Sequence, residues 1–234
     1  MPPAAVGLCE HDPTMTRIFL VRHGATTLTA EDRFAGSTDV ELSDEGRAQA
    51  AALGERLRSE QIDAVYASPL SRTRETAAIV SRACGVSSSF VDGLREISHG
   101  HWEGMTRADV EARFPGEYAS WEGDPFTFSP AGGESGAAVL ARALPALRSL
   151  LDRHPGGRML VVSHKATIRL LLSSLLGFDP RGYRDRLDQA PACLNVLDFR
   201  DPVRARLMLF NDTSHYASLP SQQAHLSKWW NGSK

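Results

Sequence analysis

Residues 160–172, LVVSHKATIRLLL, change character at the pair His164 and Lys165. The apolar, β-branched run before the pair begins at Arg158 and is typical of a buried strand. The run after the pair has the length of a helix and ends at Gly177. A buried strand that leads straight into a helix is the repeating unit of a parallel α/β sheet. Lys165 is unusual here, because a helix N-terminus disfavours cations unless a negative group lies nearby.

The same alternation of strands and helices extends over most of the chain. Apolar or β-branched runs predict further strands at 17–21, 63–68, 88–92, 194–199 and 205–210. Helical spacing predicts helices at 43–59, where a serine cap precedes an acidic first turn, and at 69–84, with Pro69 at the first helical position. We therefore expect an α/β fold: a three-layer α/β/α sandwich with a mostly parallel central sheet.

One long segment, 94–134, departs from this alternation. It is rich in glycine, proline, aromatic and charged residues, and it predicts short helices at 107–114 and around Tyr118. Long irregular segments in compact domains are often lids or binding loops, so we expect a lid-like helical and loop insertion over the sheet edge, above any site there. The expected organisation is a flexible N-terminal extension at 1–15, one domain at 16–220 and a C-terminal tail at 221–234.

Composition excludes several classes of function. The 234 residues carry a formal net charge of −2, and no basic cluster stands out, so we expect no nucleic-acid partner. The three cysteines form no CxxC pair, which argues against a disulfide framework or a thiolate zinc site. The first residues lack the features of a signal peptide, and no apolar run has the length of a membrane span. We expect a cytoplasmic protein with no membrane partner.

Charged side chains follow the carboxyl ends of three predicted strands. Arg22 and His23 follow the first strand, Arg72 or Arg74 lies just past the second, and His164 follows the strand at 158–163. Ligands of open α/β sheets bind beyond the carboxyl ends of the strands, so these side chains should converge. Guanidinium groups match phosphate oxygens, and two of them beside two histidines predict a phosphate site. A network of surface salt bridges is the alternative.

Seven motifs occur in order between residues 17 and 215: FLVRHGAT, RFAGSTDVELSDEGRAQA, VYASPLSRTRETA, LREISHGHWEGM, GGES, LVVSHKATIR and NDTSH. As a set, these motifs resemble the histidine phosphatase (phosphoglycerate-mutase-like) superfamily, although RHG alone would not be specific. The resemblance implies the α/β/α fold. It also implies a phosphomonoester hydrolase that acts on a small phosphorylated metabolite and needs neither a metal nor a cofactor.

The resemblance implies catalytic roles for five residues. His23 would be the nucleophile, phosphorylated on a ring nitrogen. Arg22, Arg72 and His164 would hold the phosphoryl oxygens, and Glu96 would protonate the leaving oxygen and later activate water. Nearby cations would keep the attacking nitrogen of His23 unprotonated, and a backbone carbonyl would fix its tautomer.

Further residues of these motifs are expected to contact the phosphate or the rest of the substrate: Thr29, Gly36, Ser37, Thr38, His99, His101 and Lys165. The family commonly has asparagine at the position of Thr29 and a small residue at that of Lys165. Lys165 either turns to solvent or pairs with a second negative group of the substrate. In either case, the phosphate of the bound substrate would offset the positive charge of Lys165. Glu103 is a second candidate for the acid, and Arg74 is expected to be structural, with Glu75 as its partner.

Several alternatives stay open. A cofactor-dependent phosphoglycerate mutase shares the catalytic motifs, but the short segment between Glu96 and His164, with few basic residues, favours hydrolysis. A non-catalytic protein that binds phosphorylated ligands would keep the same fold. The alternating His99 and His101 could bind zinc, yet no cysteine or carboxylate cluster accompanies them, so we expect no metal. The resemblance also admits a homodimer.

Overall fold

The computed structural model describes residues 12–30 and 33–217, so the predicted tail at 221–234 and most of the extension at 1–15 lie outside the described residues. Within them, six strands form one sheet in the order β3-β2-β4-β1-β5-β6. The strands are β1 (Thr16–Arg22), β2 (Ala64–Ala67), β3 (Ser88–Phe90), β4 (Arg158–Ser163), β5 (Leu194–Phe199) and β6 (Ala205–Asp212). Strands β1 to β4 are parallel, and β5 is antiparallel to both of its neighbours. The sheet is therefore mostly parallel, as predicted.

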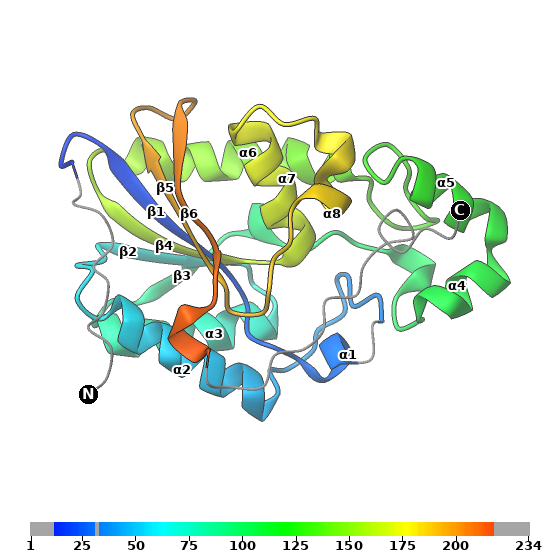
Figure 1. Ribbon diagram of the computed structural model, residues 1–234, viewed down its shortest axis with the longest axis horizontal. Helices are drawn as coiled ribbons and strands as arrows, with labels where there is room; N and C mark the ends of the chain where they lie inside the picture. The colour runs from blue at the N-terminus through cyan, green and yellow to red at the C-terminus, as the bar shows by residue number, and fades with distance from the viewer. Residues whose placement is uncertain (1–11, 31–32, 218–234) are drawn as a thin grey trace.

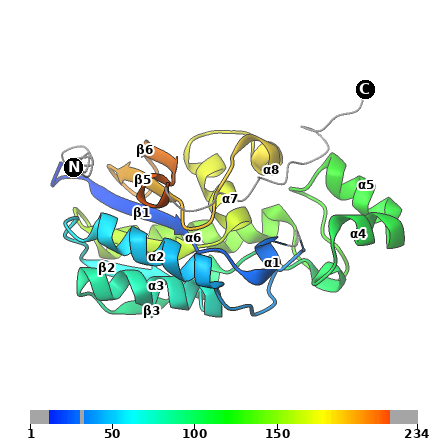
Figure 2. The same cartoon turned by 60° about the horizontal axis from the view of Figure 1, so that its bottom comes forward.

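Helices cover both faces of this sheet (Figures 1 and 2). The covering helices are α2 (Asp44–Leu57), α3 (Ser71–Cys84), α6 (Gly136–Arg153) and α7 (Lys165–Leu175). Ile18 and Leu20 of β1 pack in one apolar core with residues of α6 and α7. Phe19 and Val21, which point the other way, pack in a second core with residues of α2 and α3. Both faces of β1 are fully buried, which explains its continuous apolar run and confirms the three-layer arrangement.

The predicted helix starts are right in one case and wrong in the other. The side chain of Ser43 accepts a hydrogen bond from the first turn of α2, as expected for an N-cap. Helix α3 begins at Ser71 with Leu70 as its N-cap, so the placement of Pro69 at the first helical position is wrong. Asp39 stabilises this start, because its carboxylate accepts hydrogen bonds of 2.7 Å from both the backbone N–H and the hydroxyl of Ser71.

Helix α6 is absent from the sequence-based predictions. Ser135 caps its first turn, and the helix continues through Pro145. A proline inside a helix removes a backbone hydrogen bond and usually ends or kinks the helix. Here the buried face that includes Ala143, Leu147 and Leu150 packs against the sheet and keeps the helix continuous.

The segment 94–134 lies beyond the carboxyl ends of the strands, at the right of Figure 1. Its two short helices are α4 (Arg107–Arg113) and α5 (Pro115–Gly123). Trp102 and Trp121 of this segment pack with Phe34, from the loop after β1, in a small separate apolar cluster. The segment thus has its own packing and places a wall at the sheet edge.

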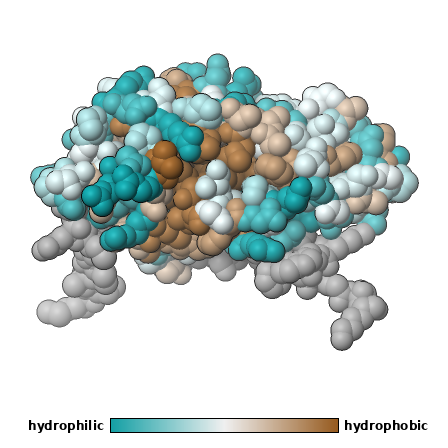
Figure 3. Space-filling view, turned by 90° about the horizontal axis from the view of Figure 1, so that it is seen from above, coloured by the Kyte–Doolittle hydropathy of each residue, from teal (hydrophilic) through white to brown (hydrophobic). Residues whose placement is uncertain are grey.

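The remaining elements are α1 (Thr27–Ala30), α8 (Tyr183–Arg186) and 3-10 turns at 92–94, 100–102, 180–182 and 214–216. Across the part of the chain that the structure describes, none of the helices combines the length and the apolar character needed to cross a membrane. Figure 3 shows apolar residues gathered at the centre of one face, with hydrophilic residues around them.

Candidate active site

The two histidines predicted for the site meet because their strands are neighbours in register. Strands β1 and β4 run parallel with Arg22 opposite Ser163, so His23 and His164 are the next residue on each chain. Their ring centroids lie 5.2 Å apart, and both side chains are buried. The parallel register therefore brings both rings to one point at the carboxyl edge of the sheet.

His23 is held as a neutral imidazole in one tautomer. Its Nδ1 lies 2.7 Å from the carbonyl oxygen of Gly24. A carbonyl can only accept a hydrogen bond, so Nδ1 carries the proton and Nε2 does not. Burial lowers the pKa of His23 well below its usual value, and the charges of Arg72 and Arg22 lower it further. The lone pair of Nε2 is therefore available for nucleophilic attack at neutral pH.

Arg72 enters the site from the first turn of α3 with its guanidinium fixed on three sides. Its Nη1 and Nη2 donate to the carbonyl oxygens of Thr38 and Gly36, each at 2.8 Å, and its Nε donates to Nδ1 of His164 at 3.2 Å. Gly36 has a φ of 50°, in the left-handed region that glycine adopts at little cost. The loop that contains Gly36 can therefore turn a carbonyl toward the buried guanidinium.

His164 contacts Arg72 and is not part of the cavity wall. Because its Nδ1 accepts from Arg72, its Nε2 carries the proton and donates to the hydroxyl of Ser68 at 2.8 Å. Burial, together with the charge of Arg72, lowers the pKa of His164 well below its usual value. His164 therefore orients Arg72, and its predicted contact with the phosphoryl oxygens stays a prediction.

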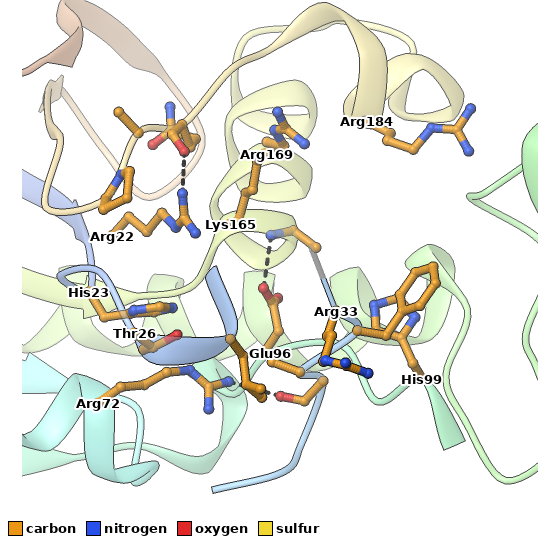
Figure 4. A pocket seen from close by; sticks show the side chains of 18 of the residues that line it. Arg22, His23, Thr26, Arg33, Arg72, Glu96, His99, Lys165, Arg169 and Arg184 are labelled. Atoms are coloured by element: carbon orange, nitrogen blue, oxygen red, sulfur yellow. Dashed lines mark hydrogen bonds between the residues drawn. The ribbon is translucent and has the colours of Figure 1, made fainter. Parts of the chain in front are cut away.

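Arg22 and Arg72 lie on either side of His23 (Figure 4). The Nη1 of Arg22 donates to the carbonyl oxygen of Gln189 at 2.7 Å, and the side chain of Gln189 is in turn hydrogen-bonded to Asn195. Burial lowers the pKa of Arg22. Its Nε is buried and has no hydrogen-bond partner among the described residues. A buried cation with an unused donor is suited to receive an anionic group.

Glu96 occupies the N-terminus of α7. Its carboxylate accepts hydrogen bonds of 3.2 Å from the backbone N–H groups of Ala166 and Thr167 and from the hydroxyl of Thr167. A carboxylate at this end of a helix is stabilised by the helix dipole. Lys165 also lies 3.9 Å from a carboxylate oxygen of Asp188. The protein itself therefore supplies negative groups beside Lys165. From the sequence, only substrate phosphate was expected to offset this charge.

These side chains open onto one cavity of about 240 Å³ (Figure 4). The predicted residues on its wall are Arg22, His23, Gly36, Arg72, Glu96, His99 and Lys165. The wall also includes residues that the sequence did not single out, among them Thr26, Arg33, Arg107, Trp121, Arg169, Tyr183, Arg184 and Asp188. They come from the loop after β1, from segment 94–134, from α7, from α8 and from the chain between α8 and β5. A cavity of this size suits a small metabolite.

Ser37, Thr38 and His101 lie outside the cavity wall. The hydroxyls of Ser37 and Thr38 donate to the carboxylate of Glu103 at 2.8 and 2.6 Å. Burial raises the pKa of Glu103, but these hydrogen bonds lower it more, so the pKa lies below its usual value. His101 lies 3.2 Å from a carboxylate of α5. Glu103 thus stabilises the loop in its ionised form. Of the two candidates for the acid, Glu96 lies on the cavity wall and Glu103 does not.

His99 is on the cavity wall, but it does not form a metal site with His101. Its ring packs on Phe34 with the centroids 4.7 Å apart. Burial lowers the pKa of His99 to about 4, so the ring is neutral at neutral pH. Within residues 12–30 and 33–217, no group of three or more His, Cys, Asp or Glu side chains gathers where it could hold a metal ion.

Two predicted positions remain, Thr29 and Arg74; the predicted substrate contact of Thr29 stays a prediction, and only the predicted partner of Arg74 differs. Thr29 lies in α1, and its side chain is outside the described residues. Arg74 is not on the cavity wall, and its guanidinium lies over the ring of Phe90, 4.5 Å from the centroid. Its predicted partner, Glu75, pairs with Arg47 at 2.6 Å. Arg74 is therefore held by an aromatic ring and not by the adjacent carboxylate.

Known proteins are similar to this chain in sequence and in fold. The mycobacterial glucosyl-3-phosphoglycerate phosphatase has a similar structure, with a TM-score of 0.77 and 30% identity over 84% of this chain and 99% of that one. Phosphoserine phosphatase 1 of Hydrogenobacter thermophilus is 34% identical over 70% of this chain and 78% of its own length. Phosphoglycerate mutase-like protein 4 of Arabidopsis thaliana is 38% identical over 69% and 72%. A family model described as "Histidine phosphatase superfamily (branch 1)" matches residues 18–213, and the chain therefore belongs to the histidine phosphatase superfamily.

Proposed function

We propose that this protein hydrolyses phosphomonoesters of small metabolites through a phosphohistidine formed on His23. One observation carries the proposal: a neutral His23, whose proton is held on Nδ1 by the Gly24 carbonyl, lies between two buried arginines. An unprotonated ring nitrogen in a cationic cavity is suited to attack the phosphorus of a bound dianion. The phosphatases among the relatives support the same class of reaction.

In the first step, Nε2 of His23 attacks phosphorus in line with the leaving oxygen. The P–N bond forms as the P–O ester bond breaks, and Glu96 gives its proton to the leaving oxygen, which departs as an alcohol. Arg22 and Arg72 neutralise the equatorial oxygens. Carbonyl acceptors hold both guanidinium groups in place, so they need little reorganisation when the charge develops. His164 acts in this scheme by orienting Arg72.

The second step regenerates the enzyme. Water attacks the phosphorus of the phosphohistidine, and the ionised Glu96 takes the proton of this water. The P–N bond breaks, inorganic phosphate leaves, and His23 is neutral again. The two steps need opposite forms of Glu96. The backbone N–H groups of Ala166 and Thr167, which donate to the carboxyl group, hold it at the cavity wall for both steps.

A cofactor-dependent phosphoglycerate mutase is the second candidate, and the mutase-like relative favours it. A mutase must keep water away from the phosphohistidine and retain a bisphosphate until the phosphoryl group returns. The short segment between Glu96 and His164 offers little chain to close over the site. Hydrolysis is therefore the better-supported outcome.

Hydrolysis of p-nitrophenyl phosphate in excess chelator tests the proposal. We expect the wild type to be active and His23→Ala to lose at least about a thousandfold in kcat. His154→Ala is a matched control, because His154 lies at the far end of α6, where it contacts Tyr66. Full activity in His23→Ala would overturn the proposal. Interconversion of phosphoglycerates stimulated by bisphosphoglycerate, in place of hydrolysis, would identify a mutase.

A further inference from the structure

The cavity has a second group of charged side chains that the proposed reaction does not use. Lys165 and Arg169 are four residues apart on α7, so they lie on one face of the helix, and both line the cavity. The carboxylate of Asp188 lies between them, 3.9 Å from Nζ of Lys165 and 3.1 Å from Nη2 of Arg169. Figure 4 shows Lys165 and Arg169 across Glu96 from Arg72.

The carboxylates of Asp188 and Glu96 do not fully compensate these two cations. Burial, together with the charges of Arg169 and Arg22, lowers the pKa of Lys165 to about 7, against the opposing effect of Asp188. Burial also lowers the pKa of Arg169 to about 10. The Nε of Arg169 is buried without a hydrogen-bond partner among the described residues. Such a pair has both charge and a donor left for another anion.

Arg184, on the same cavity wall, is a cation whose charge is compensated by two carboxylates. Its guanidinium pairs with Glu122 at 3.3 Å and with Asp185 at 3.0 Å, and it lies over the ring of Trp121. These contacts join α8 to α5, so Arg184 has a structural task. Within residues 12–30 and 33–217, Lys165 and Arg169 form ion pairs with Asp188 alone, and the side chain of Asp188 is about half exposed.

We propose that Lys165 and Arg169 form a second anion subsite, which selects phosphomonoesters that carry another negative group, either a carboxylate or a second phosphate. This proposal rests on the proposed function, because it presumes that the ester phosphate binds between Arg22 and Arg72. A group bound at α7 then lies on the leaving-group side of the substrate. Arg169 offers its unused Nε, and Lys165 offers its ammonium group.

Three substrates that differ only at one end test the subsite. Glycerol 3-phosphate ends in a neutral hydroxyl, 3-phosphoglycerate in a carboxylate, and glycerol 1,3-bisphosphate in a second phosphate. The measured quantity is kcat/KM of each charged substrate divided by that of glycerol 3-phosphate. In the wild type, we expect at least one of the two ratios to exceed one. A ratio above one only for 3-phosphoglycerate identifies a carboxylate subsite, and a ratio above one only for the bisphosphate identifies a phosphate subsite. Loss of a charge-assisted hydrogen bond should lower the ratio about tenfold or more in Lys165→Gln and in Arg169→Gln.

Two control variants separate specificity from folding. Arg169→Lys keeps the charge and should retain more of the ratio than Arg169→Gln does. Arg58→Gln also removes one positive charge, from an exposed ion pair with Glu55, and should leave the ratio at the wild-type value. Hydrolysis of all three substrates with ratios that the α7 variants do not change would overturn the subsite alone. No hydrolysis of any of them, or hydrolysis that survives His23→Ala, would overturn the proposed function and the subsite with it.

Discussion

The glycine that follows His23 packs against the backbone of α2 so closely that no side chain fits. A Cβ added to Gly24 would lie 2.9 Å from the carbonyl carbon of Gly46 and 3.0 Å from its Cα, and closer still to the carbonyl oxygen. Ordinary contacts to a Cβ begin at 3.4 Å. Gly24→Ala therefore forces the loop and the helix apart by at least about 0.5 Å.

This shift acts directly on the proposed nucleophile, because the Gly24 carbonyl holds the proton of His23 on Nδ1. Displacement of a reacting group by about 1 Å can cost roughly a hundredfold in rate, so we expect kcat to fall about tenfold or more. Overpacking of this kind also costs roughly 1–3 kcal/mol of stability, which lowers Tm by several degrees.

Both effects can be measured with p-nitrophenyl phosphate hydrolysis and thermal unfolding of the same preparations. The matched control is Gly116→Ala in α5, where an added Cβ meets no atom within 4 Å. Alanine in a helix stabilises relative to glycine, so this variant should keep full activity and an equal or higher Tm. If Gly24→Ala also keeps kcat within about twofold of the wild type, the argument that this close packing positions His23 is refuted.

Three further predictions concern buried titratable side chains. Arg17→Met should lower the free energy of unfolding, measured in urea, by about 3–5 kcal/mol, because it removes the ion-pair partner that lies 2.7 Å from the buried Asp198. The double variant with Asp198→Leu should recover stability, since it also removes the buried charge. An Arg17→Met variant as stable as the wild type would contradict this prediction. The pKa of His99 is lowered to about 4, so its neutral form stabilises the fold above the unfolded-state pKa, and this contribution is lost as pH falls below about 6.5. Urea unfolding at about pH 7 and about pH 5 should show that His99→Gln loses less stability than the wild type, and equal losses would contradict it. The pKa of Lys165 is about 7, so the preference for 3-phosphoglycerate over glycerol 3-phosphate should decline as pH rises through that value, and a flat ratio would count against a role for its charge.

The strand ends and the residues that follow them were predictable from the sequence. His23 and His164 stand directly after apolar runs, and parallel strands present their carboxyl ends at one edge. The same argument found Arg22 and left Arg72 and Arg74 as alternatives, because guanidinium groups beside histidines indicate a phosphate site; the family resemblance then singled out Arg72. Each of these placements depends only on local pattern and on the direction of the strands.

The side-chain contacts could not be predicted, because they depend on rotamers and on loops that fold back. That His164 contacts Arg72 depends on the direction of the Arg72 side chain. Asp188 reaches α7 only because the chain between α8 and β5 returns to the sheet edge. Helix α6 was missed although its apolar spacing is regular; Pro145 interrupts a pattern that tertiary packing restores.

Identification of the phosphorylated residue tests the central claim most directly. The protein would be mixed with substrate, quenched in alkali within the first turnover, and digested for mass spectrometry under conditions that preserve phosphohistidine. The account predicts one phosphoryl group, on a ring nitrogen of His23, in an amount that rises before inorganic phosphate appears and is absent from His23→Ala. Steady hydrolysis with no phosphorylated protein, or a phosphoryl group on another residue, would contradict it.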